Sequence, residues 1–494
     1  MWAAWSSGGR GRSPQGAGEA GTGWSVFSMI VAHPDSAFSM SQAQDGFAYS
    51  PEQFQQWIED ALTEARKLGA SDAGAEVSEG CGLSVSVRLG QLENVERNRD
   101  KSLGISVYLG QRRGNASTSD FSAQAIRDTA RAAYDIARFT AEDEFAGLAD
   151  EADLSLDPSQ RPELDLFHPW AIDAAQAAEI ALRCEAAALG VDRRITNSEG
   201  AAVSAQQSHF WMGNTRGFRG GYASSRHSLS VAPIAGRGAG MQRDAWYSSM
   251  RDAADLASAE AVGRYAAERA LSRLKARKVA TAEVPVLFES TMAIGLLGAL
   301  VQATSGGALY RRTTFLLDSL GQPVMAPHID IAEDPHVKKG KGSSPFDDEG
   351  VVTRARSVVQ GGVLQGYFLS SYSARKLGMK TTGHAGGSHN LRMTSRATAP
   401  GDDLPTMIRR LGRGLLVTEL MGQGVNYVTG DYSRGASGYW VENGEIAYPV
   451  HEVTIAGNLK DMLHNIVGIG ADEYTMGTKT VGSVLVTGMK LAGN

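Results

Sequence analysis

The segment from Thr291 to Gly307 reads TMAIGLLGALVQATSGG and is the longest apolar stretch of the chain. It carries no charge, no histidine and no cysteine. Its strongly apolar part, residues 292–304, is shorter than the roughly 20 residues that a membrane-spanning helix needs. Gln302 lies inside it, and no lysine or arginine cluster flanks it in a topogenic pattern. The stretch therefore predicts a buried core helix.

Composition agrees with a folded protein that does not enter a membrane. The chain has 494 residues, of which 42% are hydrophobic and 21% are charged. A net charge of −6 argues against a nucleic acid as the main partner. Only Cys81 and Cys184 are present, which excludes a disulfide scaffold and favours the cytoplasm.

Residues 1–45 differ from the rest of the chain. The run SSGGRGRSPQGAGEAGTG is of low complexity and cannot bury a core. The following WSVFSMIVAHPDSAFS has too short an apolar part for a clear signal peptide. We expect a disordered tail or a misassigned start, with Met29 and Met40 as alternative starts.

Residues 46–278 predict a mixed N-terminal domain. Ser50 and Gln53 form a capping-box pattern around Pro51, and helical spacing then continues to Gly69. Alternating residues at 84–87 and 103–109 predict neighbouring antiparallel strands with one wet face. Further elements follow, namely a helix at 122–139 with Ile126, Ala130, Ala133 and Ile136 inward, a helix at 170–189, strands within 193–250, and a long helix at 251–277.

Residues 279–494 predict a sheet-rich C-terminal domain. A hinge near residue 280 leads into a strand at 284–288 and then into the apolar stretch. Asn443-Gly444 suits a type I′ turn between two alternating runs, so a hairpin is expected there. The predicted fold class is α+β, with long helices and an antiparallel sheet before the sheet-rich domain.

His384 and His389 stand out within TTGHAGGSHNLRM. Two histidines could ligate a metal, but no third ligand stands near them in the sequence. Gly386 and Gly387 would let backbone amides approach a ligand closely. A loop that contacts substrate or braces the fold is the favoured interpretation, and a metal site is the alternative.

Other chemical motifs are weaker. Three adjacent acids, Asp347, Asp348 and Glu349, favour a charged turn over an acid/base pair. His451-Glu452 lacks a second histidine at position 455 and reads as a strand, and His464 falls in a predicted short helix. Neither a phosphate-binding loop nor a nucleophile elbow is visible.

Several long blocks together resemble one family. The blocks are YRRTTFLLDSLGQPV (310–324), the segment from GSSPFDDEGVVTR to TTGHAGGSHN (342–390), and TGDYSRGASGYWVENGEIAYPVHEVTIAGNLKDMLHNI (429–466). They resemble the TldD/PmbA family, and specifically its PmbA (TldE) branch. The N-terminal pieces ENVERNRDKSLGISVYLGQRRGNASTSD, TNSEGA and MQRDAWYSS are similar to it as well.

The resemblance implies a metallopeptidase family of the bacterial and archaeal cytoplasm, whose members were also called modulators of DNA gyrase. TldD and TldE form a heterodimer that cleaves unfolded peptides. In the TldD branch a helix carries His-Glu-x-x-x-His, which holds zinc, and a later cysteine completes the site.

That zinc-binding helix corresponds to the apolar stretch of this chain. With Leu296-Leu297 in the place of the pair that precedes the motif, Gly298, Ala299 and Ala303 replace the first histidine, the glutamate and the second histidine. No cysteine follows Cys184. The resemblance therefore implies no catalytic residue and no metal in this chain, with zinc in a TldD-like partner.

The leading hypothesis is a TldE-type subunit, silent alone, that supports a TldD-like partner acting on unfolded peptides. By the same resemblance, His384, Gly386, Gly387, His389, Asn390 and Arg392 are the candidates for groove or partner contact. The alternatives are an autonomous metal-dependent hydrolase that uses His384 and His389, and a regulatory protein-binding module. A homodimer is also possible.

Overall fold

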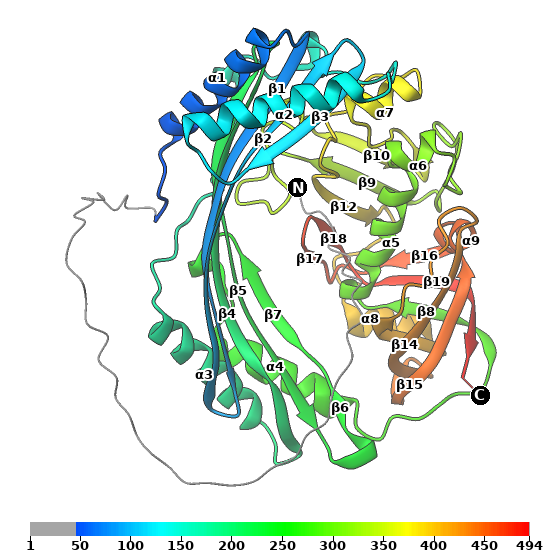
Figure 1. The fold of residues 1–494 in the computed structure, drawn as a ribbon. Coiled ribbons are helices and arrows are strands. Elements are labelled where there is room, and N and C mark those ends of the chain that lie inside the picture. The colour runs from blue at the N-terminus through cyan, green and yellow to red at the C-terminus, as the bar shows by residue number, and fades with distance from the viewer. Residues whose placement is uncertain (1–45, 494) are drawn as a thin grey trace, which may run out of the picture. The chain divides into compact units, whose positions relative to one another are not determined.

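A computed structural model describes residues 46–493 (Figure 1). The predicted tail or misassigned start at 1–45 lies outside the described residues. Residues from Tyr49 onward form one compact unit. Helices and strands are mixed within it and the strands belong to three sheets, so the predicted α+β class is confirmed.

The N-terminal half is built on one antiparallel sheet of long strands. Its order is β3 (Arg112–Thr118), β2 (Gln91–Leu109), β1 (Asp72–Arg88), β4 (Ile195–Asn214), β5 (Arg219–Ala235) and β6 (Gln242–Arg243), with β7 (Trp246–Met250) also paired to β5. The predicted strands at 84–87 and 103–109 lie on the neighbours β1 and β2.

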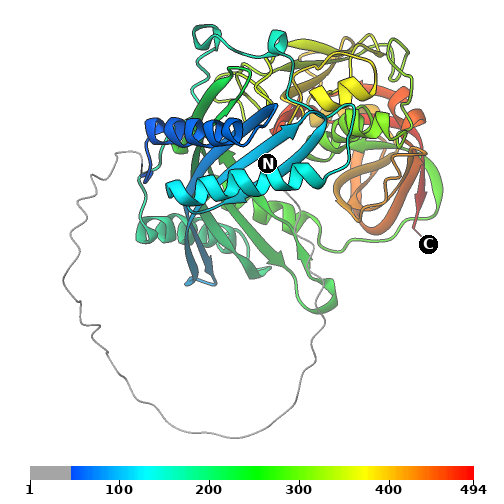
Figure 2. The same ribbon diagram turned by 45° about the horizontal axis from the view of Figure 1, so that its top comes forward.

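Four helices cover one face of this sheet. Helices α1 (Pro51–Lys67) and α2 (Ala123–Phe139) run side by side over one end of the strands (Figure 2), and α3 (Ala174–Leu189) and α4 (Ala259–Ser272) pack together near the other end. Alternate β1 residues face these helices, because Val77 belongs to the α1–α2 core and Val85 to the α3–α4 core.

The helix starts follow from capping. Ser50 Oγ accepts from the Gln53 N–H, and Gln53 Oε1 accepts from the Ser50 N–H, so the predicted capping box is present. Helix α3 begins at Ala174, later than expected, because Asp173 forms a second such box with Gln176.

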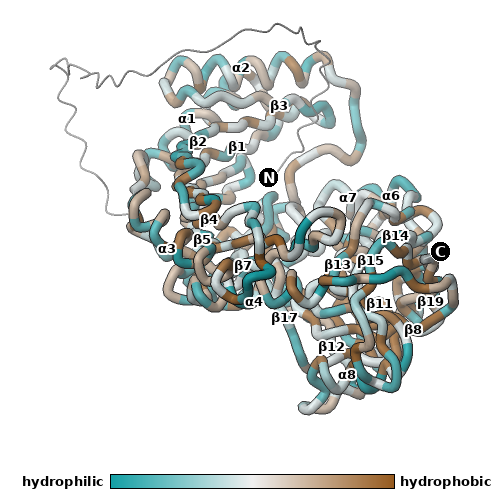
Figure 3. The backbone as a smooth tube through the Cα atoms, turned by 90° about the horizontal axis from the view of Figure 1, so that it is seen from below, coloured by the Kyte–Doolittle hydropathy of each residue, from teal (hydrophilic) through white to brown (hydrophobic). Residues whose placement is uncertain are grey.

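Two helix predictions need correction. The helix expected at 251–277 spans only 259–272, because the Ser258 hydroxyl caps a start at Ala259 and the buried Arg251 side chain bonds to loop carbonyls. In α2, Ile126 is buried as expected, but Ile136 is exposed and Ala137 is buried in its place. Hydrophilic and hydrophobic residues alternate along α2 (Figure 3).

The opposite sheet face is mostly polar, which confirms the predicted wet face. Ser84 and Ser204 are hydrogen-bonded across β1 and β4, and Gln206 donates to both. At one end this face packs instead on the C-terminal half, where Phe210 and Tyr222 contact Phe346.

The C-terminal half contains a second sheet of short strands. Its order is β11 (Val363–Leu364), β10 (Arg356–Gln360), β9 (Ile329–Asp334), β12 (Asn390–Ser395), β18 (Lys479–Val481) and β17 (Tyr474–Met476). All pairs are antiparallel except β12–β18.

The third sheet closes on itself. Its order is β15 (Glu445–Asn458), β14 (Asp431–Glu442), β13 (Gly414–Met421), β8 (Ala282–Phe288) and β19 (Val484–Ala492), and β15 pairs again with β19. Strand β16 (Ile466–Ile469) extends it from β19, and four short helices accompany the two sheets, namely α6 (Gly306–Tyr310), α7 (Ser371–Lys376), α8 (Leu404–Leu411) and α9 (Leu459–His464).

The predicted hairpin joins β14 and β15. Asn443 has φ 53° and Gly444 has φ 76°, as a type I′ turn requires. His451 lies on strand β15 and His464 is an exposed residue that ends the short helix α9, so both weaker histidines lie in the expected elements.

The apolar stretch forms helix α5 (Ser290–Ala303) and runs on into α6. It lies against β17 and β18 on one side and against β8 and β13 on another. Leu296, Leu297 and Leu300 are buried in the main C-terminal core, as expected for a core helix. No helix of the described part is long and apolar enough to cross a membrane.

An ion-pair network connects α4 to the start of α5. Arg269 donates to both carboxylate oxygens of Glu289, the residue just before α5, at 2.8 and 3.2 Å. Asp244 pairs with both Arg269 and Arg273, and Arg273 also pairs with Glu419 on β13. Charged side chains thus tie the N-terminal half to the C-terminal half.

Candidate functional site

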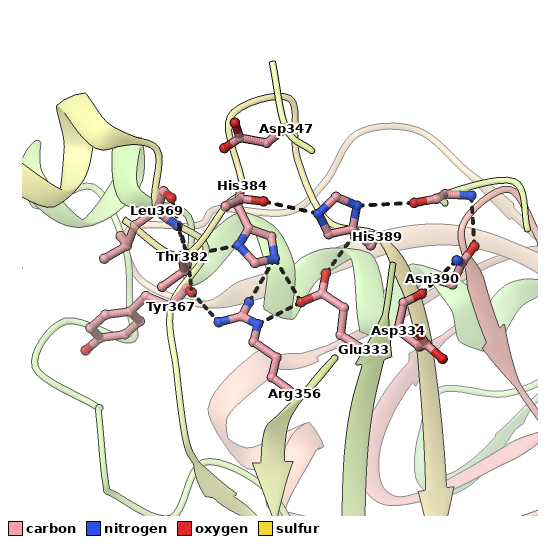
Figure 4. Close-up of polar contacts among 12 residues, drawn as sticks. Glu333, Asp334, Asp347, Arg356, Tyr367, Leu369, Thr382, His384, His389 and Asn390 are labelled. Atoms are coloured by element: carbon pink, nitrogen blue, oxygen red, sulfur yellow. Dashed lines mark hydrogen bonds and ion pairs between the residues drawn. The ribbon is translucent and has the colours of Figure 1, made fainter. Parts of the chain in front are cut away.

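The glycine-rich loop at 377–390 closes over a charged group that we call the Glu333 cluster (Figure 4). It consists of buried Glu333, His384 and His389 and of half-buried Arg356. Strand β9 alternates so that Ile329, Ile331 and Glu333 all face inward. Arg356 comes from the neighbouring strand β10, and the two histidines come from the loop.

Glu333 accepts hydrogen bonds through both carboxylate oxygens. Arg356 Nε donates to Oε2 at 2.8 Å, and His384 Nε2 lies 2.9 Å from the same oxygen. The backbone N–H of His389 donates to Oε1 at 2.7 Å. One buried carboxylate therefore fixes both histidine positions of the loop.

The surroundings determine the ionisation of this cluster. Burial by itself would raise the pKa of Glu333, but the hydrogen bond from His384 and the charge of Arg356 outweigh it and lower that pKa to about 2. Burial lowers the pKa of His384 from its ordinary value, although Glu333 opposes the shift. An ionised Glu333 therefore pairs with Arg356.

The nitrogens of both imidazole rings lie close to protein groups. His384 Nδ1 lies 2.9 Å from Thr382 Oγ1, and the ring nitrogens of His389 lie 3.2 and 3.1 Å from the carbonyl oxygens of Gly342 and Gly383. The described residues contain no group of three or more His, Cys, Asp or Glu placed to hold a metal ion. The arrangement braces the loop.

The remaining loop candidates are half-buried or exposed. Asn390 donates to the Asp334 carbonyl and to Ser343 Oγ, both at 2.8 Å. Gly386 and Gly387 are exposed and have φ of 104° and 117°, a region that favours glycine. Arg392 lies on β12 and forms an exposed bidentate pair with Glu473.

Asp347, from the acidic turn, braces the same loop. Its carboxylate accepts backbone N–H groups of Glu349, Val351 and Ala385. Burial, with the nearby charge of Glu349, raises the pKa of Asp347 to about 7 despite those bonds. Glu349 accepts the N–H of Ser371 at the start of α7. These contacts are those of a charged turn that braces the loop.

Helix α5 presents small residues where the resemblance places metal ligands. Ala299 and Ala303 are buried, and Gly298 is partly exposed, with open space where a Cβ would stand. The carboxylate just before the helix, Glu289, is already bound by Arg269. These residues offer no donor set that fits a zinc ion.

A cavity of about 110 Å³ lies beside α5. It is lined by Met292, Gly295, Leu296 and Ala299 of the helix and by Leu420, Gln423, Val425, Tyr427, Tyr432 and Arg434 of the β13–β14 region. Arg434 Nε is buried there and has no hydrogen-bond partner. We call this cavity the α5 pocket.

Sequence reasoning missed Glu333, Arg356 and Arg434. The alternation in HIDIAED could have indicated that Glu333 shares a buried face with two isoleucines. Arg434 gives no such signal, because burial along β14 does not alternate regularly.

Family models match three consecutive segments of the chain. Residues 75–137 match domain 1 of the PmbA/TldA metallopeptidases, residues 167–274 match the central domain, and residues 281–493 match the C-terminal domain. The chain belongs to the PmbA/TldA metallopeptidase family.

Named relatives are similar over most of their length. The chain is 50% identical to "Metalloprotease PmbA" of Escherichia coli O157:H7 over 440 residues, which cover 88% of this chain and 96% of that protein. It is 46% identical to "Metalloprotease PmbA homolog" of Haemophilus influenzae, covering 90% and 97%. The suspected family is thus confirmed.

Solved structures share the fold. A putative modulator of DNA gyrase from Bacteroides thetaiotaomicron superposes with a TM-score of 0.84 at 27% identity, covering 90% of this chain and 100% of that one. TldE from Thermococcus kodakarensis superposes with a TM-score of 0.76 at 20% identity, covering 88% and 100%, which supports the fold alone.

Proposed function

We propose that this chain is the TldE-type subunit of a cytoplasmic zinc metallopeptidase that cleaves unfolded peptides. The chain is catalytically silent alone and supports a TldD-like partner that holds the zinc. The observation that carries the proposal is helix α5, where Gly298, Ala299 and Ala303 occupy the positions that the resemblance assigns to the zinc motif.

Elementary metal chemistry supports this assignment. A zinc ion that cleaves peptides needs about three protein ligands and a base near its water. Glycine and alanine side chains supply neither. The identity to PmbA metalloproteases supports a role in proteolysis, so the missing ligands point to a division of labour between two chains.

An autonomous hydrolase at His384 and His389 has less support. Every ring nitrogen of the two histidines already lies within hydrogen-bond distance of a protein group. Binding a metal there would have to break bonds that position the loop, and Glu333 would have to leave Arg356.

The test combines purified chains. This protein is purified alone, and also with a TldD-like chain from the same source that carries His-Glu-x-x-x-His. Complex formation is measured by size-exclusion chromatography, zinc by mass spectrometry, and cleavage with an unfolded peptide. We expect a stable complex, with zinc and cleavage only when the TldD-like chain is present.

A matched control replaces the motif glutamate of the TldD-like chain by glutamine, which should abolish cleavage and leave the complex intact. Stoichiometric zinc and cleavage by this chain alone would overturn the proposal. So would the failure of the two chains to associate, whether this chain then forms a homodimer or stays a monomer.

A further inference from the structure

The α5 pocket contains a positive charge without a counter-charge. Among the described residues half-buried Arg434 takes part in no ion pair, and its Nε, which has almost no accessible surface, has no hydrogen-bond partner. A buried polar group normally has a partner, because leaving it unsatisfied costs free energy. The pocket lining therefore includes a guanidinium without a counter-charge, and an anion is the acceptor that best suits a guanidinium.

The lining defines what kind of anion fits. Tyr427, Tyr432 and Gln423 carry groups that can donate further hydrogen bonds, and burial raises the pKa of Tyr432 to about 12, so its hydroxyl keeps its proton. Met292 and Leu296 make the helix side apolar. A carboxylate attached to a small aliphatic group matches both sides.

Size and charge favour a carboxylate over a phosphate. The cavity holds about 110 Å³, enough for a carboxylate and a few carbon atoms. One planar guanidinium binds one carboxylate through two parallel hydrogen bonds. Among its lining residues Arg434 is the only charged one, so a phosphate dianion would keep an uncompensated negative charge.

The glycine of the helix keeps the pocket open. Gly295 is exposed, and no atom lies within 4 Å of the position where its Cβ would stand. A larger side chain at this position would enter the cavity without striking the backbone. The helix that carries no metal ligands thus leaves room for a ligand of a different kind.

We propose that the α5 pocket binds a peptide carboxylate through Arg434, with the adjoining aliphatic group against Met292 and Leu296. The carboxylate belongs either to the C-terminus of a peptide or to an aspartate or glutamate side chain. This inference rests on the proposed function only for the choice of peptides as ligands. It concerns binding by this chain alone.

The test uses the full chain without any partner. Three fluorescein-labelled, unstructured peptides of the same length are compared by fluorescence anisotropy. One ends in Ala-Leu with a free carboxylate, the second is its C-terminal amide, and the third is the amide with an internal glutamate in place of a glutamine. We expect at least one carboxylate-bearing peptide to bind about tenfold more tightly than the neutral amide.

Variants link this preference to the pocket. Arg434→Met should remove the preference, whereas Arg434→Lys should keep part of it as a point charge. Gly295→Leu should block binding by filling the cavity. Gln302→Leu is the matched control, because Gln302 is exposed on the same helix but does not line the pocket, and its binding should equal that of the wild type.

Thermal unfolding of each variant shows whether it folds. If Arg434→Met does not fold, Gly295→Leu still tests the proposal. Equal binding of all three peptides to the wild type would overturn the proposal, as would a preference that survives both Arg434→Met and Gly295→Leu. Tight binding of only the free-acid peptide assigns the C-terminus, and tight binding of only the glutamate peptide assigns the side chain. Because no TldD-like chain is present, these results do not depend on complex formation.

Discussion

Glu333 shows how one buried carboxylate can organise a loop. It joins two strands to the glycine-rich segment through Arg356, His384 and the backbone of His389. Breaking a buried ion pair by removing one partner is costly, because the other charge stays buried without compensation. The stability of the loop therefore depends on the charge of this residue.

The Glu333→Gln variant tests that dependence through pH. The folded-state pKa of Glu333 is about 2 and its ordinary value is 4.5, so its stabilising effect is complete above pH 4.5 and is lost as the pH falls toward 2. We expect the variant to be less stable than the wild type at pH 6. The difference in free energy of unfolding between the wild type and the variant should shrink by about 2 kcal/mol between pH 6 and pH 3, as measured by urea unfolding.

The control for this experiment is Glu473→Gln, which removes an exposed pair with Arg392. Exposed pairs contribute at most about 1 kcal/mol, so the free energy of unfolding of Glu473→Gln should differ little from that of the wild type at both pH values. A gap for Glu333→Gln that is the same at pH 6 and pH 3 would contradict an ionised Glu333 of low pKa.

The two cysteines should differ in reactivity. Neither forms a disulfide, but Cys184 is buried, and burial together with Glu260 and Glu185 raises its pKa to about 12. Only a thiolate reacts readily with a disulfide reagent. We expect one fast-reacting thiol per native chain at pH 8, which a Cys81→Ser variant removes, and two in denaturant. A fast reaction of Cys184 in the native chain would refute this assignment.

Single residues were the part of the site that the sequence predicted least. His384 and His389 could be recognised as candidates from their residue type. Their roles, however, depend on Glu333, which is 51 positions from His384 and 56 from His389. Arg434 lies on a strand whose burial pattern is irregular. Such long-range juxtapositions arise from sheet order, which no local pattern contains.

At the level of elements, glycines in helices occur in two different environments, one with free space beside the Cα and one with close packing. Gly298 in α5 has open space at its Cβ position, whereas in α4 a Cβ on Gly263 would stand 2.2 Å from the Cys184 carbonyl oxygen. Only the second glycine is required by close helix packing, here between α3 and α4.

Alanine substitutions at these two glycines should therefore act in opposite directions. Gly298→Ala should stabilise the protein by about 0.5–1 kcal/mol, because glycine is unfavourable inside a helix. Gly263→Ala should destabilise it by about 1–3 kcal/mol through overpacking. Urea unfolding at neutral pH measures both, and a destabilised Gly298→Ala would mean that the space beside α5 is not free.

Elements were predicted well where local chemistry determines them. The capping box of α1 and the Asn443-Gly444 hairpin appear as expected. The start of α4 was wrong, because alanine-rich spacing continues through residues that tertiary contacts of Arg251 hold outside the helix. The tertiary contacts of the buried Arg251 side chain outweigh the helix propensity of this segment.

At the scale of the whole described unit, the Arg269–Glu289 pair connects the two halves. Burial alone would lower the pKa of Arg269, but Glu289 and Asp244 raise it, so the guanidinium stays protonated. The chain between the halves exposes Lys275, Arg277 and Lys278. The Arg277 N–H donates to the Pro449 carbonyl, so separation of the halves would release this backbone and should be detectable as faster proteolysis at these residues.

The Glu289→Ala variant should be cleaved by trypsin within 274–281 faster than the wild type. Removing this buried partner leaves Arg269 with Asp244 as its remaining counter-charge, at a cost of up to about 3–5 kcal/mol. Cleavage is followed by mass spectrometry under native conditions, with Glu199→Ala as the control because it removes only an exposed pair with Arg243. Equal cleavage of the two variants would show that the pair does not hold the halves together.

The sharing of β1 between two hydrophobic cores has a consequence for folding accuracy. Val77 contributes to the α1–α2 core and Val85 to the α3–α4 core, on one continuous strand. A slip of one residue against β4 would turn both sets of side chains to the polar face at once. A misaligned sheet would therefore lose burial in both cores. Because β1 is continuous, correct packing under either helix pair also favours the correct register under the other.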